Sequence, residues 1–149
     1  MKAVVQRVNR ATLVCDDKLI SQIGKGVVVY FGVGKGDSEK QAEYLAKKIS
    51  ALRIFSDENG KMNLSCKDLG YEILSVSQFT LYADVSHGNR PGFSDAEEPT
   101  RANALYEYFC ECLEKNGVVV KRGVFGGDMT ISQENQGPVT IIYDIPAEL

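Results

Sequence analysis

Small polar side chains follow an apolar stretch at Ser77–Leu81, which reads Ser-Gln-Phe-Thr-Leu. The preceding residues, Ile73–Val76, do not alternate regularly between apolar and polar types, which predicts a strand buried on both faces. Polar groups at the end of such a strand must find hydrogen-bond partners or take part in chemistry. The hydroxyls of Ser77 and Thr80 could act on a substrate or could satisfy nearby backbone groups, and this segment alone favours the second interpretation.

A nucleophilic role for Thr80 requires a base within hydrogen-bond reach. The single histidine, His87, is the only candidate, and it lies in a polar stretch that we expect to be a loop. The chain has four cysteines, without C-x-x-C spacing: Cys15, Cys66, Cys110 and Cys112. Neither a histidine-based nor a cysteine-based zinc site is therefore predicted. The glycines of Gly32–Asp37 lack the spacing of a nucleotide-binding loop, so we expect no metal and no cofactor.

The elements that position these residues follow from the periodicity of the apolar side chains. Strands are predicted at four places: two within residues 3–23 around a turn at 16–18, one at 27–33, and one at 73–76. Three more are predicted towards the C-terminus, at residues 118–120, 129–131 and 139–145. Asn135–Pro138 has the composition of a turn and separates the last two strands.

Two amphipathic helices are predicted between these groups of strands. Ser38 and Gln41 form a Ser-x-x-Gln capping box, and apolar residues recur at helical spacing as far as Leu52. The second helix follows Pro99 and ends before residues 116–117, which read Asn-Gly. Two segments are predicted to be irregular, at residues 61–69 and 84–98, and the length of the second is typical of a functional loop.

This arrangement indicates an α+β fold with a compact, largely antiparallel, β-barrel-like sheet and two main helices. The length suits a single domain spanning residues 1–149. A net charge of -3 argues against bulk electrostatic coating of nucleic acid but permits a local contact. Charge occurs too early for a signal peptide, and no apolar run approaches the roughly 20 residues that span a bilayer. We therefore expect a cytoplasmic protein outside the membrane.

Several stretches together resemble the D-aminoacyl-tRNA deacylase family. Ser77–Leu81 and the Asn-Gln-Gly-Pro-Val-Thr of residues 135–140 look like the paired signatures of that family. The resemblance runs end to end and includes residues 1–8, residues 88–91 with Phe93, and residues 125–129. Gly127 is a small departure, because relatives often have alanine there.

The resemblance implies hydrolysis of the ester that joins a D-amino acid, or glycine on a non-cognate tRNA such as tRNA-Ala, to the 3′-terminal adenosine of tRNA. It also implies a homodimer in which the Gly137-Pro138 bond, in cis, reaches into the site of the other subunit. Together with Met129, these residues would bind the substrate, and their carbonyls would exclude an L side chain while a D side chain points to solvent. Arg7 is a candidate support for this segment, because guanidinium donors fix carbonyl orientation; it could equally be a surface charge.

The resemblance assigns the catalytic positions to Ser77, Gln78, Phe79 and Thr80. We favour a substrate-assisted route, in which the 2′-hydroxyl of the terminal ribose activates water and backbone N–H groups near Phe79 and Thr80 stabilise the oxyanion. One such donor contributes roughly 3 kcal/mol. Gln78 would position the adenosine or the carbonyl, Phe79 would pack against adenine, and Ser77 and Thr80 would hold the loop. Covalent catalysis by Thr80 is the alternative.

Two other classes of function fit the same residues. A non-catalytic tRNA-end-binding module would grip the 3′ end without turnover. A small-molecule esterase or amidase would accept free D-amino acid esters as readily as charged tRNA.

Overall fold

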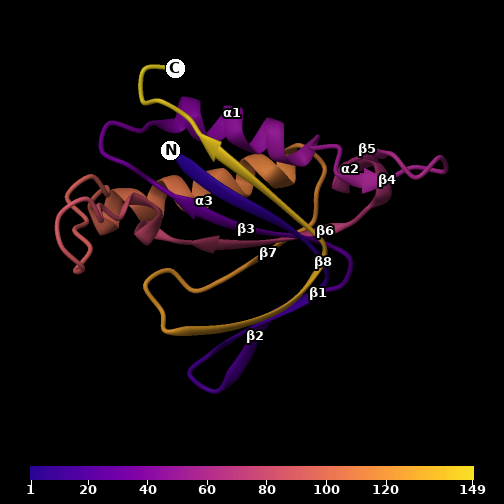
Figure 1. Ribbon diagram of the computed structural model, residues 1–149, viewed down its shortest axis with the longest axis horizontal. Helices are drawn as coiled ribbons and strands as arrows, with labels where there is room; N and C mark the ends of the chain where they lie inside the picture. The colour runs from indigo at the N-terminus through magenta and orange to yellow at the C-terminus, as the bar shows by residue number, and fades with distance from the viewer.

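In the computed structural model, which describes residues 1–149, a mixed sheet curls into a nearly closed barrel and two long helices cover one of its faces (Figure 1). The strand order is β2-β1-β3-β6-β7, and β8 pairs with β1 outside this path. The hydroxyl of Ser21 on β2 donates to the backbone oxygen of Arg122 on β7 at 2.6 Å, which joins the two ends of the path. The strands are β1 (Lys2–Cys15), β2 (Lys18–Ile23), β3 (Gly26–Gly32), β6 (Glu72–Ser77), β7 (Val120–Arg122) and β8 (Met129–Asp144).

The sheet is organised around β1, which pairs antiparallel with β2, β3 and β8. The β3–β6 and β6–β7 pairings are parallel. The α+β, barrel-like fold expected from the sequence is thus confirmed, and the antiparallel pairings are joined by two parallel ones. β3 and β6 lie in the middle of the path, which explains why both are almost continuously apolar.

The apolar side chains form two clusters on opposite faces of the sheet. The larger cluster lies beneath α1 (Glu39–Ser50) and α3 (Pro99–Lys115), where the rings of Phe31 and Phe109 stack with centroids 4.2 Å apart. The smaller cluster, which includes Leu13, Val28 and Val76, fills the interior of the barrel. Both predicted helices are present, and the side-chain oxygen of Gln41 accepts from the N–H of Ser38 at 2.8 Å in the capping box.

The prediction that residues 61–69 are irregular is wrong. They form β5 (Met62–Leu64), which pairs with β4 (Phe55–Ser56), and the single helical turn α2 (Cys66–Leu69). A capping box holds α2, because the hydroxyl of Ser65 accepts from the N–H of Asp68 at 3.1 Å and the Asp68 carboxylate accepts from the N–H of Ser65 at 2.9 Å. Elements this short are not visible to periodicity arguments.

The predicted turn at Asn135–Pro138 is also wrong, since both flanking segments belong to one strand, β8. Opposite β1, the register passes from Gln6 paired with Thr140 to Val8 paired with Asn135. Residues 136–139 therefore protrude from β8 without partners on β1, and we call them the 136–139 bulge.

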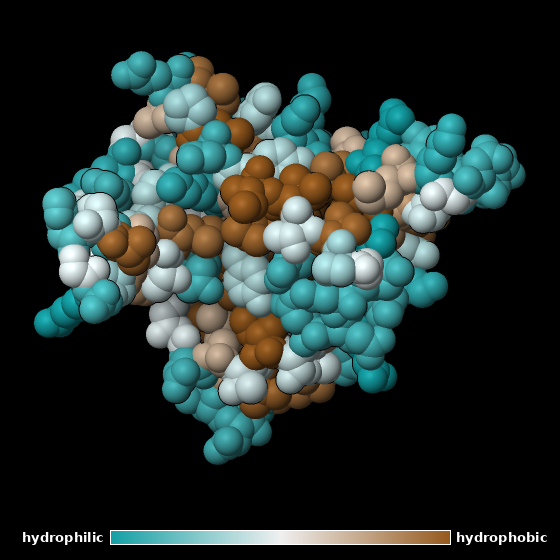
Figure 2. All heavy atoms as spheres, viewed as in Figure 1, coloured by the Kyte–Doolittle hydropathy of each residue, from teal (hydrophilic) through white to brown (hydrophobic).

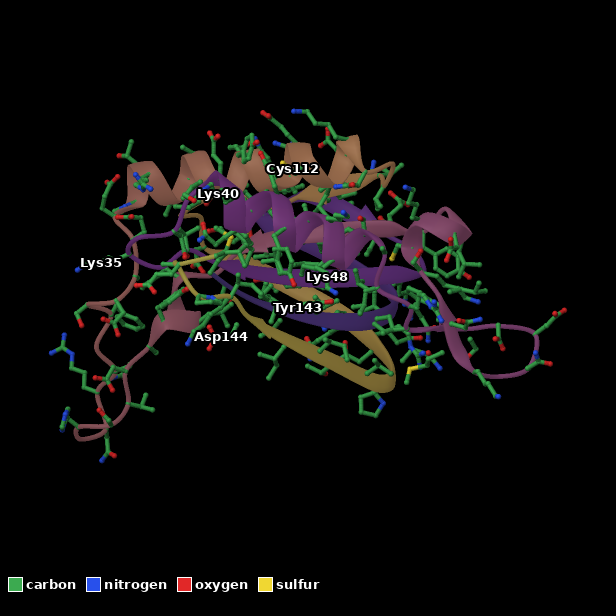
Figure 3. All side chains as sticks on the ribbon, turned by 90° about the horizontal axis from the view of Figure 1, so that it is seen from above. Lys35, Lys40, Lys48, Cys112, Tyr143 and Asp144 are labelled. Carbon is green, nitrogen blue, oxygen red and sulfur yellow. The ribbon has the colours of Figure 1, made fainter.

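β8 pairs with β1 along one edge, and its other edge has no strand partner. Figure 2 shows apolar side chains gathered on the face that β8 crosses, and Ile142 is 73% exposed there. Val139, Ile141 and Tyr143 pack against the larger cluster but are only half-buried. Seen from above, Tyr143 and Asp144 lie at the C-terminal end of β8, beside α1 (Figure 3).

None of the helices combines the length and the apolar character needed to cross a membrane.

Candidate active site

A pocket of about 620 Å³ opens where β6 ends. It lies between that end of β6, the short helix η1 (Phe79–Tyr82), the start of α3 and the segment that leads into β8. Its apolar walls come from Val33, Val76, Phe79, Phe93, Ala96, Pro99, Ala102, Phe125, Met129 and Ile131. Its polar side chains are those of Ser77, Gln78, Glu97 and Asp128. An apolar cavity with a few converging polar groups is typical of a small-ligand site.

The backbone at the end of β6 is fixed by β3. Ser77 pairs with Phe31, and the N–H of Gln78 donates to the backbone oxygen of Phe31 at 2.7 Å before the chain turns into η1. A Cβ at Gly32 would lie 3.0 Å from the oxygen of Gln78. A Cβ at Gly34 would lie 2.5 Å from the ring of Tyr82. These two glycines therefore let η1 lie directly against the chain at the end of β3.

Tyr82 anchors the far end of η1. Its hydroxyl donates to Oδ2 of Asp37 at 3.4 Å, and the same carboxylate oxygen accepts from the N–H of Gly34 at 2.7 Å. Burial, followed by the charge of Asp37, raises the pKa of Tyr82, so that its hydroxyl stays protonated and can donate. The turn that presents Phe79 and Thr80 is thus held at both ends.

The hydroxyl of Thr80 is bonded to an amide and not to a base. Nε2 of Gln78 donates to Oγ1 of Thr80 at 2.6 Å, and an amide N–H cannot accept the proton that a nucleophilic hydroxyl must lose. His87 lies on the fully exposed part of the loop that begins after η1. This geometry does not provide the activated hydroxyl that covalent catalysis requires.

Phe79 stands at the rim of the pocket, 54% exposed. Its ring meets that of Phe93 edge to face, with centroids 5.0 Å apart. Such a pair leaves an aromatic face open to a planar ligand. Met129, the first residue of β8, also lines the pocket, so the structure brings Ser77, Gln78, Phe79 and Met129 together.

Gly137 and Pro138 lie in the 136–139 bulge and do not line the pocket of their own chain. The peptide bond between them is cis, and both residues are exposed. The Arg7 guanidinium donates through Nε to the backbone oxygen of Gln136 at 3.1 Å and through Nη1 to that of Ile54 at 2.6 Å. Arg7 is buried, so it is not a solvated surface charge.

Sequence reasoning missed two contributions to the pocket, that of α3 through Pro99 and Ala102 and that of Glu97, which precedes the helix. Glu97 lies beside the pocket, and its carboxylate pairs with Nε of Arg101 at 3.1 Å. Nη2 of Arg101 also donates to the backbone oxygen of Asp37 at 2.6 Å, which fixes the start of α3 against the connection between β3 and α1. The only available signal was the spacing of Glu97 and Arg101 by four residues, which is common on exposed helices.

No group of three or more His, Cys, Asp or Glu side chains is placed to hold a metal ion. The cysteines are all buried, and burial raises the pKa of Cys66 to about 12. A thiol with so high a pKa stays protonated at neutral pH and is a poor nucleophile.

Residues 4–144 match the family model described as D-Tyr-tRNA(Tyr) deacylase. A D-aminoacyl-tRNA deacylase of Staphylococcus carnosus is 54% identical over 144 residues, which cover 97% of this chain and 95% of that protein. One of Thermotoga petrophila is 50% identical over 144 residues, which cover 97% of each.

Two solved structures share the fold. The c-Myc DNA unwinding element binding protein superposes with a TM-score of 0.93 at 44% identity, covering 98% of this chain and 99% of that one. A probable eukaryotic D-amino acid tRNA deacylase superposes with a TM-score of 0.83 over 97% of this chain and 98% of that one. At 20% identity, the second likeness concerns the fold alone.

Proposed function

Because this chain belongs to the D-Tyr-tRNA(Tyr) deacylase family and is a hydrolase of that family, we propose that it hydrolyses the ester bond of D-aminoacyl-tRNA to free D-amino acid and tRNA. The observation that carries this proposal is the pocket at the end of β6, because the Ser-Gln-Phe-Thr segment lines or borders it. The open faces of Phe79 and Phe93 suit the adenine of the tRNA 3′ end. Stacking of one base on an aromatic side chain contributes about 1–3 kcal/mol.

The proposed chemistry is substrate-assisted. The 2′-hydroxyl of the terminal ribose activates a water molecule, which attacks the ester carbonyl. The bond between the carbonyl carbon and the ribose oxygen then breaks, and that oxygen takes up a proton. The N–H groups of Phe79 and Thr80 stabilise the oxyanion, since the leading N–H groups of a helical turn have no partners within it. The Gln78–Thr80 hydrogen bond supports this route, because the partner of the Thr80 hydroxyl is an amide donor and not a base that could take its proton.

We further propose a homodimer in which the 136–139 bulge of one subunit enters the pocket of the other and rejects L-amino acids. Gly137 and Pro138 are exposed and lie outside the pocket of their own chain. Arg7 holds the bulge through its hydrogen bond to the backbone oxygen of Gln136. The free edge of β8 and the exposed Ile142 supply a surface that an isologous contact would cover.

The same filter cannot reject glycine, which has no side chain, so glycine on a non-cognate tRNA such as tRNA-Ala is a second proposed substrate. Charged tRNA as the substrate also implies that the reaction takes place in the cytoplasm.

The test follows the loss of charged species when purified protein is incubated with D-tyrosyl-tRNA or L-tyrosyl-tRNA. We expect the D form to decay well above the buffer rate and the L form to persist. Equal decay, or none above buffer, would remove the deacylase proposal. Binding of both without decay would favour the non-catalytic tRNA-end-binding module, and equal turnover of free D-tyrosine ethyl ester would favour the small-molecule esterase.

The dimer is tested by sedimentation of Ile142→Lys, with Leu19→Lys as control because Leu19 is 59% exposed on the β2 hairpin. We expect the first variant alone to sediment as an inactive monomer. A wild-type monomer with full activity at micromolar concentration would overturn the dimer and leave the deacylase proposal intact.

A further inference from the structure

A chain of hydrogen-bonded polar side chains joins the neighbouring strands β3, β1 and β8 beside the 136–139 bulge. The hydroxyl of Tyr30 donates to Oε1 of Gln133 at 2.7 Å. Nε2 of Gln133 donates to Oε1 of Gln6 at 2.9 Å and to Oδ1 of Asn135 at 2.5 Å. Nε2 of Gln6 in turn donates towards Oγ1 of Thr140, 3.4 Å away.

This network meets both ends of the bulge. Asn135 is the last residue in register with β1 before the bulge, and Thr140 is the first one after it. Residues 136–139 have no ladder partners on β1, so side chains must fix their position. Arg7 holds the bulge at the backbone of Gln136, and the network holds its two flanks.

Tyr30 determines which way the Gln133 amide points. Tyr30 is half-buried against the apolar interior of the barrel, where its hydroxyl needs an acceptor. Because a phenol donates to it, Gln133 presents its oxygen to Tyr30 and turns its NH2 group towards Gln6 and Asn135. Without that donor, the amides of Gln133, Gln6 and Asn135 could turn by half a turn together, so that the network would have a second arrangement and would no longer hold the bulge in one position.

We propose that Tyr30 and Gln133 are positioning residues for stereochemical discrimination, which hold the 136–139 bulge at the depth at which an L side chain is excluded from the partner's pocket. This inference rests on the proposed function. It concerns the accuracy of the enzyme and not its chemistry, because neither residue lines the pocket.

The experiment compares Tyr30→Phe with the wild type on D-tyrosyl-tRNA and L-tyrosyl-tRNA. Loss of one neutral hydrogen bond predicts a fall of about three- to tenfold in the ratio of the D rate to the L rate, through faster hydrolysis of the L form. The kcat for the D form should change less than about twofold. Tyr71→Phe is the control, since Tyr71 is also half-buried and its ring packs against that of Phe55 outside the network.

A second variant separates positioning from general stability. If Tyr30 acts through Gln133, Tyr30→Phe introduced into a Gln133→Met background should cause no further fall in the ratio. A Tyr30→Phe protein that melts earlier but keeps the wild-type ratio would overturn the inference while leaving the proposed function standing. If Tyr30→Phe does not fold, Gln6→Met replaces it, because Gln6 belongs to the same network and is half-exposed. We expect the same fall in the ratio of the D rate to the L rate. A wild type without preference for the D form would overturn the proposed function itself.

Discussion

Arg7 and Gln136 are bonded across the most irregular part of β8, with Nε of Arg7 3.1 Å from the backbone oxygen of Gln136. The same guanidinium donates to the backbone oxygen of Ile54, which belongs to the larger apolar cluster. Arg7 therefore ties an exposed bulge to the rigid core of its own subunit. Two carbonyls in different directions need a donor with several fixed N–H groups, which lysine does not have.

Replacing Arg7 by lysine should therefore loosen the bulge without removing the positive charge. Hydrogen bonds from charged groups contribute about 1.5–3 kcal/mol, so losing one should lower the ratio of D to L hydrolysis at least about tenfold. The measurement is the decay of both tyrosyl-tRNAs. Arg10→Lys is the control, because Arg10 is 76% exposed and pairs only with Glu134. A ratio unchanged in Arg7→Lys would show that the guanidinium does not hold the bulge.

Gly137→Ala should disturb the bulge directly. Gly137 has φ of 125°, and an added Cβ would lie 3.0 Å from Nη2 of Arg7 and from the backbone nitrogen of Val139. We expect a loss of about 1–3 kcal/mol in the free energy of unfolding, measured in urea, together with loss of D-tyrosyl-tRNA hydrolysis.

Gly60→Ala is the matched control for that change. Gly60 has φ of 74°, but an added Cβ meets nothing within 4 Å. It should therefore cost about 1–2 kcal/mol of stability and leave the activity unchanged. Equal activities in the two alanine variants would count against a role for the bulge.

The amino-acid sequence drew attention to Ser77–Leu81 because Ser77 breaks an apolar strand with a polar segment, but this local signal alone favoured a structural role, and the resemblance supplied the candidate catalytic positions. The sequence did not reveal the bulge, since Asn135–Pro138 has the composition of a turn. Only the pairing of Gln6 with Thr140 shows that the chain continues along β1 after a bulge and does not turn back. The contribution of Glu97 could not be predicted either. That residue precedes α3 and is held at the pocket by its N–H, which donates to the backbone oxygen of Val33 at 3.0 Å, and such a long-range contact leaves no periodic pattern.

Phe79→Ala should weaken substrate binding more than folding. Phe79 is 54% exposed and its main aromatic contact is Phe93, so the stability should change by less than about 1 kcal/mol. Loss of base stacking should raise the KM for D-tyrosyl-tRNA about tenfold or more. Met62→Ala, at a similarly exposed apolar position on β5, should leave the KM unchanged. An unaltered KM in Phe79→Ala would place the adenine elsewhere.

Alkaline pH should destabilise the protein through Cys66. Its pKa is raised from 9.0 to about 12 by burial, so above pH 9 the unfolded thiol ionises while the folded one remains protonated. The unfolded state then binds fewer protons, and the free energy of unfolding falls by up to about 1.4 kcal/mol per pH unit for this group. Below pH 9 this effect should vanish. Urea titrations between pH 7 and 10.5 give the free energy of unfolding at each pH. Above pH 9 it should fall less steeply with pH in Cys66→Ala than in the wild type. An identical pH dependence would show that Cys66 does not cause the effect.

Thr80→Val distinguishes the two catalytic routes. In the structure Oγ1 of Thr80 accepts from Gln78 and has no base, so we expect the variant to retain kcat within about tenfold of the wild type. If Thr80 were the nucleophile, the loss would be much larger, since deleting a nucleophile typically lowers kcat by several orders of magnitude. The complementary substrate is D-tyrosyl-tRNA ending in 2′-deoxyadenosine, which should react about 100-fold or more slowly with the wild type if the 2′-hydroxyl activates water. A normal rate with that substrate, combined with an inactive Thr80→Val protein, would reverse the assignment and make Thr80 the nucleophile.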